Sequence, residues 1–531
     1  MQALTSRPAA VVITGGLAAM AVVLGWFLVS ASGKAEGVEL TTAELVPHDT
    51  TVYVALNTKL DSSEWIAAFD LIERLGAEDP EEELINAAEE DGLVDWEDDV
   101  APFLGGNAAF YMGAYDWSSG EAPNEFGVIV QAADAERAME VVFEQLGGDE
   151  ADEVEYEGQP YYYIPDPIDG DGYLARIGSH LVVTGSEAEM ERVIDVAQGR
   201  SPSLKDDAEF AALHDELTKN FIGFVYMDTE KLLSGALEAG LGVFFEDDDE
   251  LWQWGSSKSA SVISAKDGGF VFQAAGQTET SPISPLLTAR DESRFAQMVP
   301  ADAAMFFSIH NVAGAWDGIT DAWRDELDEI VRAEGEFDSF DEAMDDAAAE
   351  IGVEDFEDFI ELFNGEAALA GWFPTANEDE GIFAGLVEVS DEARLREIVE
   401  NSESIDITRE ETWGGVEVSI YESDDESGEE FAFALADGYA LLGDPEAVQL
   451  VLESDGDSLA DTARYQDAKD TLGMRLGSFG YFDLASLTET ISGGGFVSPE
   501  VFQFDSLQAL IFNMVEDGGF TRSAGAVTIG D

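Results

Sequence analysis

A short acidic loop is the part of this sequence whose residue spacing comes nearest to a metal site. Asp166, Asp169 and Asp171 stand within a Pro-Asp-Pro-Ile-Asp-Gly-Asp-Gly segment. Calcium is bound by several hard oxygen ligands at close range, and carboxylates with this spacing can supply them. The glutamate that closes a helix–loop–helix calcium site is absent, because the twelfth residue counted from Asp166 is Ile177. We therefore expect either a weak calcium site or the solvated tip of a hairpin.

Two runs of carboxylates, at residues 246–250 and 422–426, could in principle perform acid–base chemistry. Paired carboxylates act as acid and base only where a pocket moves their pKa values apart. In a chain with this many acidic residues, such runs also arise as solvated loops. We favour that interpretation for both runs.

The other catalytic residue types do not occur in recognised patterns. The four histidines, His48, His180, His214 and His310, are widely separated, and no H-E-x-x-H motif is present. No Walker loop occurs, and the Gly-Ser-Phe-Gly segment at 477–480 is one residue short of a nucleophile elbow. We interpret that segment as the start of a strand. The sequence thus predicts no catalytic residue and no cofactor other than the weak calcium site.

Composition restricts the partners that this chain can have. Of its 531 residues, 113 are acidic and 24 are lysine or arginine, which gives a formal net charge of -89. A surface of this charge repels nucleic-acid phosphates and favours cations or basic partners. Hydrophobic residues make up 45% of the chain, enough for sizeable cores. The absence of cysteine excludes disulfides, thiolate metal sites and cysteine nucleophiles.

Residues 9–29 form an uncharged apolar run of 21 residues near the N-terminus. A helix of that length spans about 30 Å, the thickness of the hydrocarbon core of a bilayer. Arg7 precedes the run and Trp26 lies near its far end, which predicts a single-pass membrane anchor with the bulk of the chain outside the cytoplasm. The alternative is a signal peptide that is cleaved before Ser32. In both cases residues 1–31 are separate from the folded body, and the lipid bilayer is the partner of the apolar run.

The body of the chain contains two similar halves. Six matched pairs of segments occur in the same order and are offset by 250 to 260 residues. They begin at Val46 and Val299, Gly92 and Gly352, Gly105 and Gly365, Gly185 and Gly443, Phe224 and Phe479, and Asp267 and Asp517. We therefore expect two copies of one unit, at residues 46–278 and 299–531. Residues 32–45 and the proline-containing stretch 279–298 are interpreted as linkers.

Each copy has the pattern of a mainly antiparallel α+β unit. The predicted strands of the first copy cover 52–56, 108–112, 127–131, 161–164, 174–177, 181–184, 259–265 and 270–274, and the predicted helices 134–146, 186–197 and 207–217. Asp134 and Ser186 have the position of N-caps, and Asp267-Gly268-Gly269 that of a hairpin turn. The fold class is therefore α+β, with two tandem copies of a sheet-plus-helices unit behind a transmembrane helix, and not a doubly wound parallel sheet.

Five segments of the first copy form an ordered set of motifs. They are Val46–Asn57, Pro102–Gly105, Tyr156–Gly158, Ser186–Glu189 and Ser203–Phe210. This set resembles an uncharacterised family of bacterial exported proteins, the domain of unknown function 3352. The resemblance is close in the first copy and loose in the second: Phe103 stands where the family has tryptophan, and Leu362–Gly365 lacks the proline. It implies an exported protein of this architecture and no activity.

The sequence favours a membrane-anchored extracytoplasmic protein that binds or organises something at the cell surface without catalysis. A carboxylate- or metal-dependent hydrolase is the alternative, and it requires a pocket in which carboxylates converge. A third interpretation makes the acidity an adaptation to high salt. No motif specifies a ligand, a reaction or an oligomeric state.

We predict that the melting temperature of the body rises strongly with salt. Like charges repel one another in the folded body, and the screening length falls from about 30 Å at 0.01 M salt to about 3 Å at 1 M. Thermal melts across this range of NaCl test the prediction, and an unchanged melting temperature would contradict it. If Asp166, Asp169 and Asp171 bind calcium, millimolar calcium raises the melting temperature more than NaCl of equal ionic strength.

Overall fold

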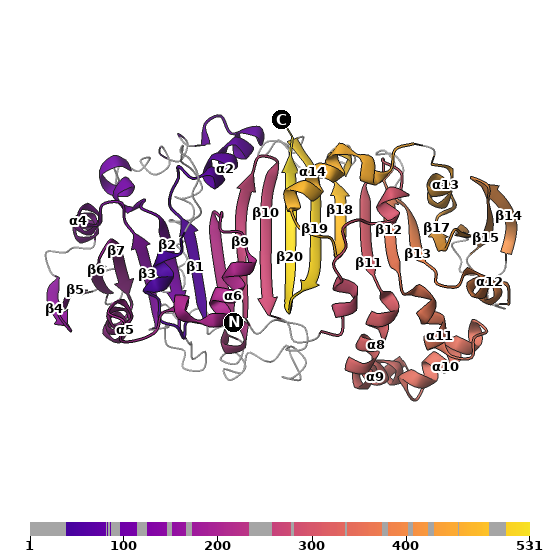
Figure 1. The fold of residues 1–531 in the computed structure, drawn as a ribbon, viewed down its shortest axis with the longest axis horizontal. Helices are drawn as coiled ribbons and strands as arrows, with labels where there is room; N and C mark the ends of the chain where they lie inside the picture. The colour runs from indigo at the N-terminus through magenta and orange to yellow at the C-terminus, as the bar shows by residue number, and fades with distance from the viewer. Residues whose placement is uncertain are drawn as a thin grey trace. The chain divides into compact units, whose positions relative to one another are not determined.

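The computed structural model divides the chain into two units, Met1–Thr278 and Glu279–Asp531 (Figure 1). The residues that it describes are 39–80, 82, 85, 96–113, 125–145, 151–165, 172–232, 258–277, 281–334, 337–373, 381–401, 407–422, 430–454, 456–487 and 506–530. The predicted membrane segment 9–29 lies outside these ranges. Within them, no helix combines the length and the apolar character needed to cross a bilayer.

The first unit is built on an antiparallel sheet. Its strands are β1 (Val52–Asn57), β2 (Asn107–Met112), β3 (Phe126–Gln131), β4 (Asp152–Tyr156), β5 (Gln159–Ile164), β6 (Gly172–Ile177), β7 (His180–Thr184), β8 (Gly223–Asp228), β9 (Lys258–Lys266) and β10 (Gly269–Gln277). Its helices and helical turns are η2 (Thr41–Glu44), α2 (Ser63–Arg74), η3 (Trp96–Val100), η4 (Ala101–Phe103), α4 (Ala135–Gln145), α5 (Glu187–Ala197), η6 (Leu204–Asp206) and α6 (Ala208–Glu216). The strand order is β4-β5-β6-β7-β3-β2-β1-β8-β9-β10, with every pair antiparallel.

The second unit has an antiparallel sheet of the same strand order. Its strands are β11 (Met305–His310), β12 (Glu366–Trp372), β13 (Ile382–Glu388), β14 (Ile407–Trp413), β15 (Val416–Glu422), β16 (Glu430–Ala436), β17 (Tyr439–Gly443), β18 (Ser478–Asp483), β19 (Leu507–Asp517) and β20 (Phe520–Ile529). Its helices and helical turns are η9 (Ser284–Leu287), η10 (Phe295–Gln297), α8 (Val312–Ala322), α9 (Arg324–Glu334), α10 (Phe340–Glu350), α11 (Phe356–Ile360), η11 (Glu361–Phe363), α12 (Glu392–Asn401), α13 (Pro445–Glu453), η12 (Leu459–Asp461) and α14 (Ala463–Leu472). The order β14-β15-β16-β17-β13-β12-β11-β18-β19-β20 corresponds strand for strand to that of the first unit.

Local sequence signals account for the element boundaries that were predicted. The Ser186 side chain accepts a hydrogen bond from the Glu189 N–H and caps α5, and Asp134 accepts from the Arg137 N–H at the start of α4. The turn at residues 267–268 joins β9 to β10 as a hairpin. The predicted α+β class with a mainly antiparallel sheet is confirmed.

The two faces of the second sheet differ. One face, which we call the covered face, carries fully buried side chains such as Phe306, Leu441 and Ile511. Tyr465 of α14 packs against this face, with its ring centroid 5.3 Å from that of Tyr481. The opposite face, which we call the open face, is only partly covered by helices and retains exposed apolar side chains.

In each unit a Val-Pro pair fixes the chain before the first strand to a Ser-Leu pair far along the sequence. In the first unit the Leu204 N–H donates to the Val46 carbonyl oxygen over 2.8 Å. The Ser203 hydroxyl and N–H both donate to Asp206 Oδ2 over 2.9 Å. These hydrogen bonds hold the pKa of the Asp206 carboxyl below its usual value.

The second unit repeats this arrangement with other residues. The Leu459 N–H donates to the Val299 carbonyl oxygen over 2.8 Å. The Ser458 hydroxyl donates to Asp461 Oδ2 over 2.7 Å, and the Ser458 N–H donates to the same atom over 3.1 Å. Several of the repeated motifs are therefore structural ties between the start of each unit and its later helices.

We predict that Ser458→Ala and Ser203→Ala each lower the free energy of unfolding by about 1 kcal/mol. The substitution removes an N-terminal cap and leaves the partner carboxylate without its hydroxyl donor. Chemical unfolding monitored by circular dichroism measures the change, with the exposed Ser201→Ala as the control that should stay within about 0.5 kcal/mol. Equal losses of stability in all three variants would contradict the structural role given to Ser203 and Ser458.

Candidate functional site

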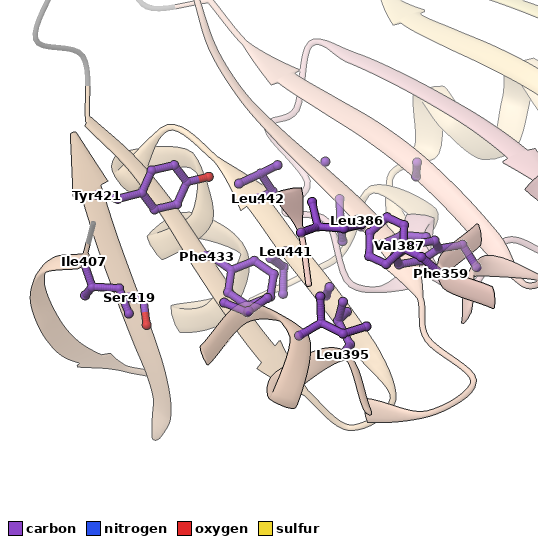
Figure 2. Close-up of a pocket in the computed structure, with 17 residues that line it drawn as sticks. Phe359, Leu386, Val387, Leu395, Ile407, Ser419, Tyr421, Phe433, Leu441 and Leu442 are labelled. Atoms are coloured by element: carbon purple, nitrogen blue, oxygen red, sulfur yellow. The ribbon is translucent and has the colours of Figure 1, made fainter. Parts of the chain in front are cut away.

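The second unit contains an apolar cavity of about 390 Å³ on the open face of its sheet. Strands β12, β13, β15, β16 and β17 form its floor, and α11, η11 and α12 form its cover. Figure 2 shows the residues that line this space, with Phe359 and Leu395 coming from the helical cover and Val387, Phe433 and Leu442 from the strands. They include Phe359, Val387, Leu395, Ile407, Ser419, Tyr421, Phe433 and Leu442. A volume of this size lies within the range of small-molecule sites in proteins.

The lining carries almost no polar groups. Among the described residues, Ser419 and Tyr421 of β15 provide the only side-chain hydroxyls of the lining, and no charged side chain belongs to it. Burial raises the pKa of the Tyr421 hydroxyl, so this group stays neutral at physiological pH. Figure 2 shows that hydroxyl directed toward Leu442. The cavity can therefore hold an apolar group and offers two neutral hydrogen-bonding groups at one wall.

Small residues in the strands leave this space open. Gly385 of β13 and Ala440 of β17 stand on the open face, where their neighbours carry large side chains. A Cβ at Gly385 would meet only the Leu442 carbonyl oxygen, at 3.5 Å, so a side chain could be accommodated by the backbone there. Asn107 and Glu366 are the first residues of β2 and β12, so the two units can be aligned on them. In this alignment Val128 of the first unit takes the position of Gly385. The first unit therefore has a larger side chain at the position where Gly385 lines the cavity of the second unit.

The cover is formed by one face of α12 and by two rings from the preceding turns. Leu395, Ile398 and Val399 are spaced three and four residues apart and so lie on one side of α12. Phe359 and Phe363 project from α11 and η11, with ring centroids 5.1 Å apart. These side chains pack on Val387 and Phe433, which closes the cavity away from solvent on that side.

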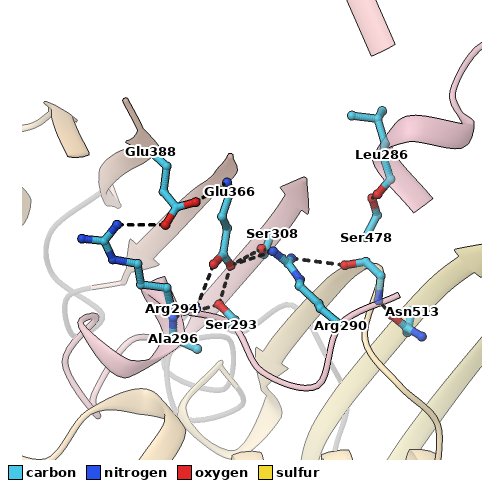
Figure 3. Close-up of polar contacts among 11 residues, drawn as sticks. Leu286, Arg290, Ser293, Arg294, Ala296, Ser308, Glu366, Glu388, Ser478 and Asn513 are labelled. Carbon is cyan, nitrogen blue, oxygen red and sulfur yellow. Dashed lines mark hydrogen bonds and ion pairs between the residues drawn. The ribbon is translucent and has the colours of Figure 1, made fainter. Parts of the chain in front are cut away.

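A buried carboxylate beside the cavity holds the second unit together. Glu366 is 3% exposed and begins β12. Its Oε1 accepts hydrogen bonds from the Ser293 hydroxyl over 2.5 Å and the Ser308 hydroxyl over 2.6 Å, and its Oε2 accepts from the Arg294 N–H over 2.8 Å. Arg290 Nη1 lies 3.3 Å from Oε1. Figure 3 shows Glu366 between Arg294 and Arg290, with dashed lines from its carboxylate to Ser293, Ser308 and Arg290.

A second carboxylate extends this network to the cavity strands. Glu388, at the end of β13, accepts from the Glu366 N–H over 2.9 Å and from Arg294 Nη1 over 2.8 Å. Burial acts to raise the pKa of Glu388, but the hydrogen bonds from Arg294 and from the backbone outweigh it and lower the pKa. Arg294 Nη2 also donates to the Asp437 carbonyl oxygen, in the turn between β16 and β17, over 2.9 Å. The network therefore ties together the ends of the strands that form the cavity floor.

The first unit uses a neutral amide in the same position. Asn107, the first residue of β2, is fully buried. Its Oδ1 accepts from the Thr42 hydroxyl over 2.6 Å, and its Nδ2 donates to the Glu39 carbonyl oxygen over 2.6 Å. Both units thus fix the segment before their first strand through the first residue of their second strand.

Another buried carboxylate lies in the first unit. Glu189 of α5 accepts from the Tyr111 hydroxyl over 2.8 Å and from Arg192 Nη1 over 2.9 Å. Burial raises the pKa of Glu189, although Arg192 acts in the opposite direction. Arg192 also pairs with the exposed carboxylates Asp49 and Glu125. The arrangement joins α5 to β2 and to the chain before β1.

The sequence-predicted metal and acidic sites fall outside the described residues. Asp166, Asp169 and Asp171 are among the residues that the structure does not describe, as are residues 246–250 and 423–426. Within the ranges that it does describe, no group of three or more acidic or histidine residues is placed to hold a metal ion. The weak calcium site stays a prediction.

The histidines and the short Gly-Ser-Phe-Gly segment have structural surroundings. His214 stacks on Phe210, and burial together with the charge of Lys219 lowers its pKa to about 4. His180 bonds with the Thr41 hydroxyl over 3.2 Å, and His48 is exposed. The Ser478 hydroxyl donates to the Leu286 carbonyl oxygen over 2.8 Å at the start of β18, as expected for a strand start.

The cavity and the Glu366 network were not predicted from the sequence. Arg290, Ser293 and Arg294 belong to the stretch 279–298 that was interpreted as a linker, yet they pack within the second unit. Glu366 resembles any of the other acidic residues in the sequence. A usable signal was the concentration of two arginines and a serine within five residues of a chain that is poor in basic residues.

Comparison with known proteins gives one family match and only weak structural similarities. The family model described as "Protein of unknown function (DUF3352)" matches residues 10–505, which confirms the resemblance seen in the motifs. No curated protein matches the chain. Two crystal forms of a protein named TP0453 align with a TM-score of 0.25 at 11% and 12% identity, over 46% and 49% of this chain and 81% and 90% of that one. A cleaved viral serpin, CrmA, aligns with a TM-score of 0.09 at 12% identity, over 48% of this chain and 95% of that one. Similarities at these scores carry no argument about fold or function.

We predict that His310 makes the second unit sensitive to acid. Burial and the neighbouring charge of Arg290 lower the pKa of His310, while Glu366 and Glu388 act in the opposite direction. In the unfolded chain the pKa is near 6.5, so the unfolded state takes up the proton first and stability falls as the pH drops below about 6.5.

The substitution His310→Asn should remove this part of the acid sensitivity. Asparagine is the residue that the first unit has at the corresponding position, Asn57. Urea unfolding at pH 7.5 and pH 5.5 measures it, with the exposed His48→Asn as the matched control. The same loss of stability in His310→Asn and in the unaltered chain would contradict the prediction.

Proposed function

This chain belongs to the family of proteins of unknown function named DUF3352, which brings no activity with it, and we propose from its own geometry that it is a non-catalytic binding protein for an apolar molecule. The site is the cavity between β12, β13, β15, β16, β17 and helix α12. The single observation that carries the proposal is a space of about 390 Å³ whose lining, as far as the structure describes the chain, includes two hydroxyls and no charged side chain. In an otherwise highly acidic chain, an uncharged concave surface of this size marks a ligand site.

The buried carboxylates support binding over hydrolysis. A hydrolase of the kind considered above needs carboxylates that converge on a substrate with separated pKa values. Glu366 instead receives donors from Ser293, Ser308 and Arg294, and the carboxylate oxygens are occupied in holding the fold. Neither Glu366 nor Glu388 lines the cavity.

The proposed location is the outer surface of a membrane. We propose that residues 9–29 anchor the chain and that the body lies outside the cytoplasm, because the apolar run is 21 residues long and follows Arg7. A tether of this kind would keep an apolar-ligand site next to a bilayer, which is a source of apolar molecules. The acidity of the body would then also keep it from lying flat on anionic lipid.

We further propose that the two units arose by duplication and have since diverged in role. The six ordered sequence matches and the corresponding strand orders support this origin. The first unit has Val128 where the second has Gly385, so the apolar site belongs to the second unit. The calcium-binding loop at Asp166, Asp169 and Asp171, if it forms, would be a property of the first unit alone.

We predict that Gly385→Val lowers the affinity for an uncharged apolar probe about tenfold or more. The side chain would enter the cavity and displace ligand volume, and about 1.4 kcal/mol of lost apolar burial corresponds to a factor of ten. Fluorescence of N-phenyl-1-naphthylamine added to the full chain measures binding. All variants are measured in the same solubilising medium, so that partition of the probe into that medium is equal for each.

The matched control is Gly525→Val in β20. A Cβ there meets only the Ile511 carbonyl oxygen, at 3.8 Å, and the position is five strands from Gly385 in the sheet order. It should leave probe affinity unchanged. Equal probe binding by the unaltered chain and Gly385→Val, with both folded by circular dichroism, would contradict the proposed site.

A further inference from the structure

The cavity does not end at its lining but continues into a row of apolar side chains across the open face. Cross-strand partners lie on the same face of a sheet. Phe433 of β16 pairs with Leu442 of β17, which pairs with Gly385 of β13, then with Leu369 of β12 and Phe307 of β11. These five residues form one line perpendicular to the strands, and the first three also line the cavity.

The row extends over two more strands. Phe307 pairs with Gly480 of β18, and Gly480 pairs with Phe512 of β19. A Cβ at Gly480 would lie 2.3 Å from the Phe512 ring and 2.8 Å from the Phe307 ring, so both rings lie over the glycine. Their centroids are 5.8 Å apart. The glycine lets the two aromatic side chains make a continuous apolar strip.

This row is exposed in a way that its counterpart is not. Leu442, Leu369 and Phe512 are 48%, 40% and 41% exposed. The corresponding row of the first unit contains Val128 and Phe110, and the strand register places none of that unit's large exposed apolar residues in it. Exposed apolar surface of this kind on one sheet, continuous with an apolar cavity, marks a binding surface.

The row is long enough to hold a single long hydrocarbon chain over part of its length. Phe433 and Phe512 are six strand spacings apart, about 29 Å at roughly 4.8 Å for each spacing. One acyl chain of a bilayer leaflet spans about 15 Å, half the hydrocarbon thickness. A chain of this length whose first carbons lie at Phe433 therefore ends near Leu369, which is three spacings or about 14 Å away.

The other end of the row is polar and acidic. Ser419 of β15 pairs with Phe433 on one side and with Glu410 of β14 on the other, so a carboxylate stands beside the cavity hydroxyls on the same face. Within the part of the chain that the structure describes, Glu410 takes part in no ion pair. A negatively charged head group would meet this carboxylate and the net charge of -89.

We propose that the cavity and the row form one track for a long-chain amphiphile with an uncharged or cationic head. The head lies at Ser419 and Glu410, and the hydrocarbon chain passes from Phe433 through the cavity and ends at Leu369. This inference rests on the proposed function of the cavity and extends it to a class of ligand. The occupant is a single acyl or alkyl chain of membrane-lipid length.

Chain length gives the first test. Monoacylglycerols with 8, 12 and 16 carbons displace N-phenyl-1-naphthylamine from the full chain, each used below its aggregation concentration. Affinity should rise about twofold for each added methylene across the whole series, because the row covers one side of the hydrocarbon beyond the cavity. A rise that stops after the 8-carbon compound would overturn the track and leave the cavity.

Leu369→Ser gives the second test. It should weaken the 16-carbon compound at least threefold and leave the 8-carbon compound unchanged, because Leu369 lies outside the cavity lining. The control is Ile330→Ser on α9, which removes an apolar side chain of 58% exposure away from the sheet. Equal effects of the two substitutions on the 16-carbon compound would overturn the track.

Head-group charge gives the third test. A 16-carbon alkyltrimethylammonium should bind at least as tightly as the monoacylglycerol, and the 16-carbon fatty acid more weakly, at 1 M NaCl where the long-range field is screened. Tight binding of the fatty acid would overturn the head-group assignment. If the displacement of the probe by these compounds were the same in the unaltered chain and in Gly385→Val, the proposed function itself would be refuted. The two failures can therefore be told apart.

Discussion

The second unit depends on the way in which one buried carboxylate is satisfied. Glu366 lies at the first position of β12, where water does not reach it, and an unpaired charge there would be strongly destabilising. Two serine hydroxyls and a backbone N–H supply its hydrogen-bond donors, and the Arg290 guanidinium forms an ion pair with it. These donors come from the segment before the first strand and from β11, so the carboxylate fixes both to β12. Arg294 then carries the connection to β13 and to the turn between β16 and β17.

The apolar site follows from this framework. The ends of the floor strands are held by hydrogen bonds, so their middle positions need not be tightly packed to keep the sheet in register. Gly385 and Ala440 stand at such positions, and the helices above them supply large side chains without filling the space. The first unit satisfies the same position with Asn107 and has Val128 in place of the glycine. The two units therefore differ, among other features, in the chemistry of this anchor and in the volume of this residue, and the cavity lies in the unit that has Glu366 and Gly385.

Sequence patterns predicted the elements that local chemistry controls. These elements are short-range features: the helix caps Ser186 and Asp134, and the turn between β9 and β10. A side chain that can accept a hydrogen bond from a backbone N–H three residues later can be recognised in the sequence. The cavity cannot be recognised in the sequence, because its walls come from β13, β16 and β17, and only the strand order of the folded sheet brings these strands together. Arg290 and Ser293 were missed for a related reason: the prolines nearby suggested a linker, and only the folded chain brings these residues to Glu366.

The proposed function requires the second unit to remove apolar surface of a ligand from water. The most direct measurement is the heat-capacity change of binding, obtained by titration calorimetry of the full chain with 1-monoacylglycerol at several temperatures. Burial of apolar surface gives a negative heat-capacity change, so we predict a clearly negative value that is lost in Gly385→Val and kept in Gly525→Val. Binding heat with no heat-capacity change, or a negative change that is identical in Gly385→Val, would contradict it.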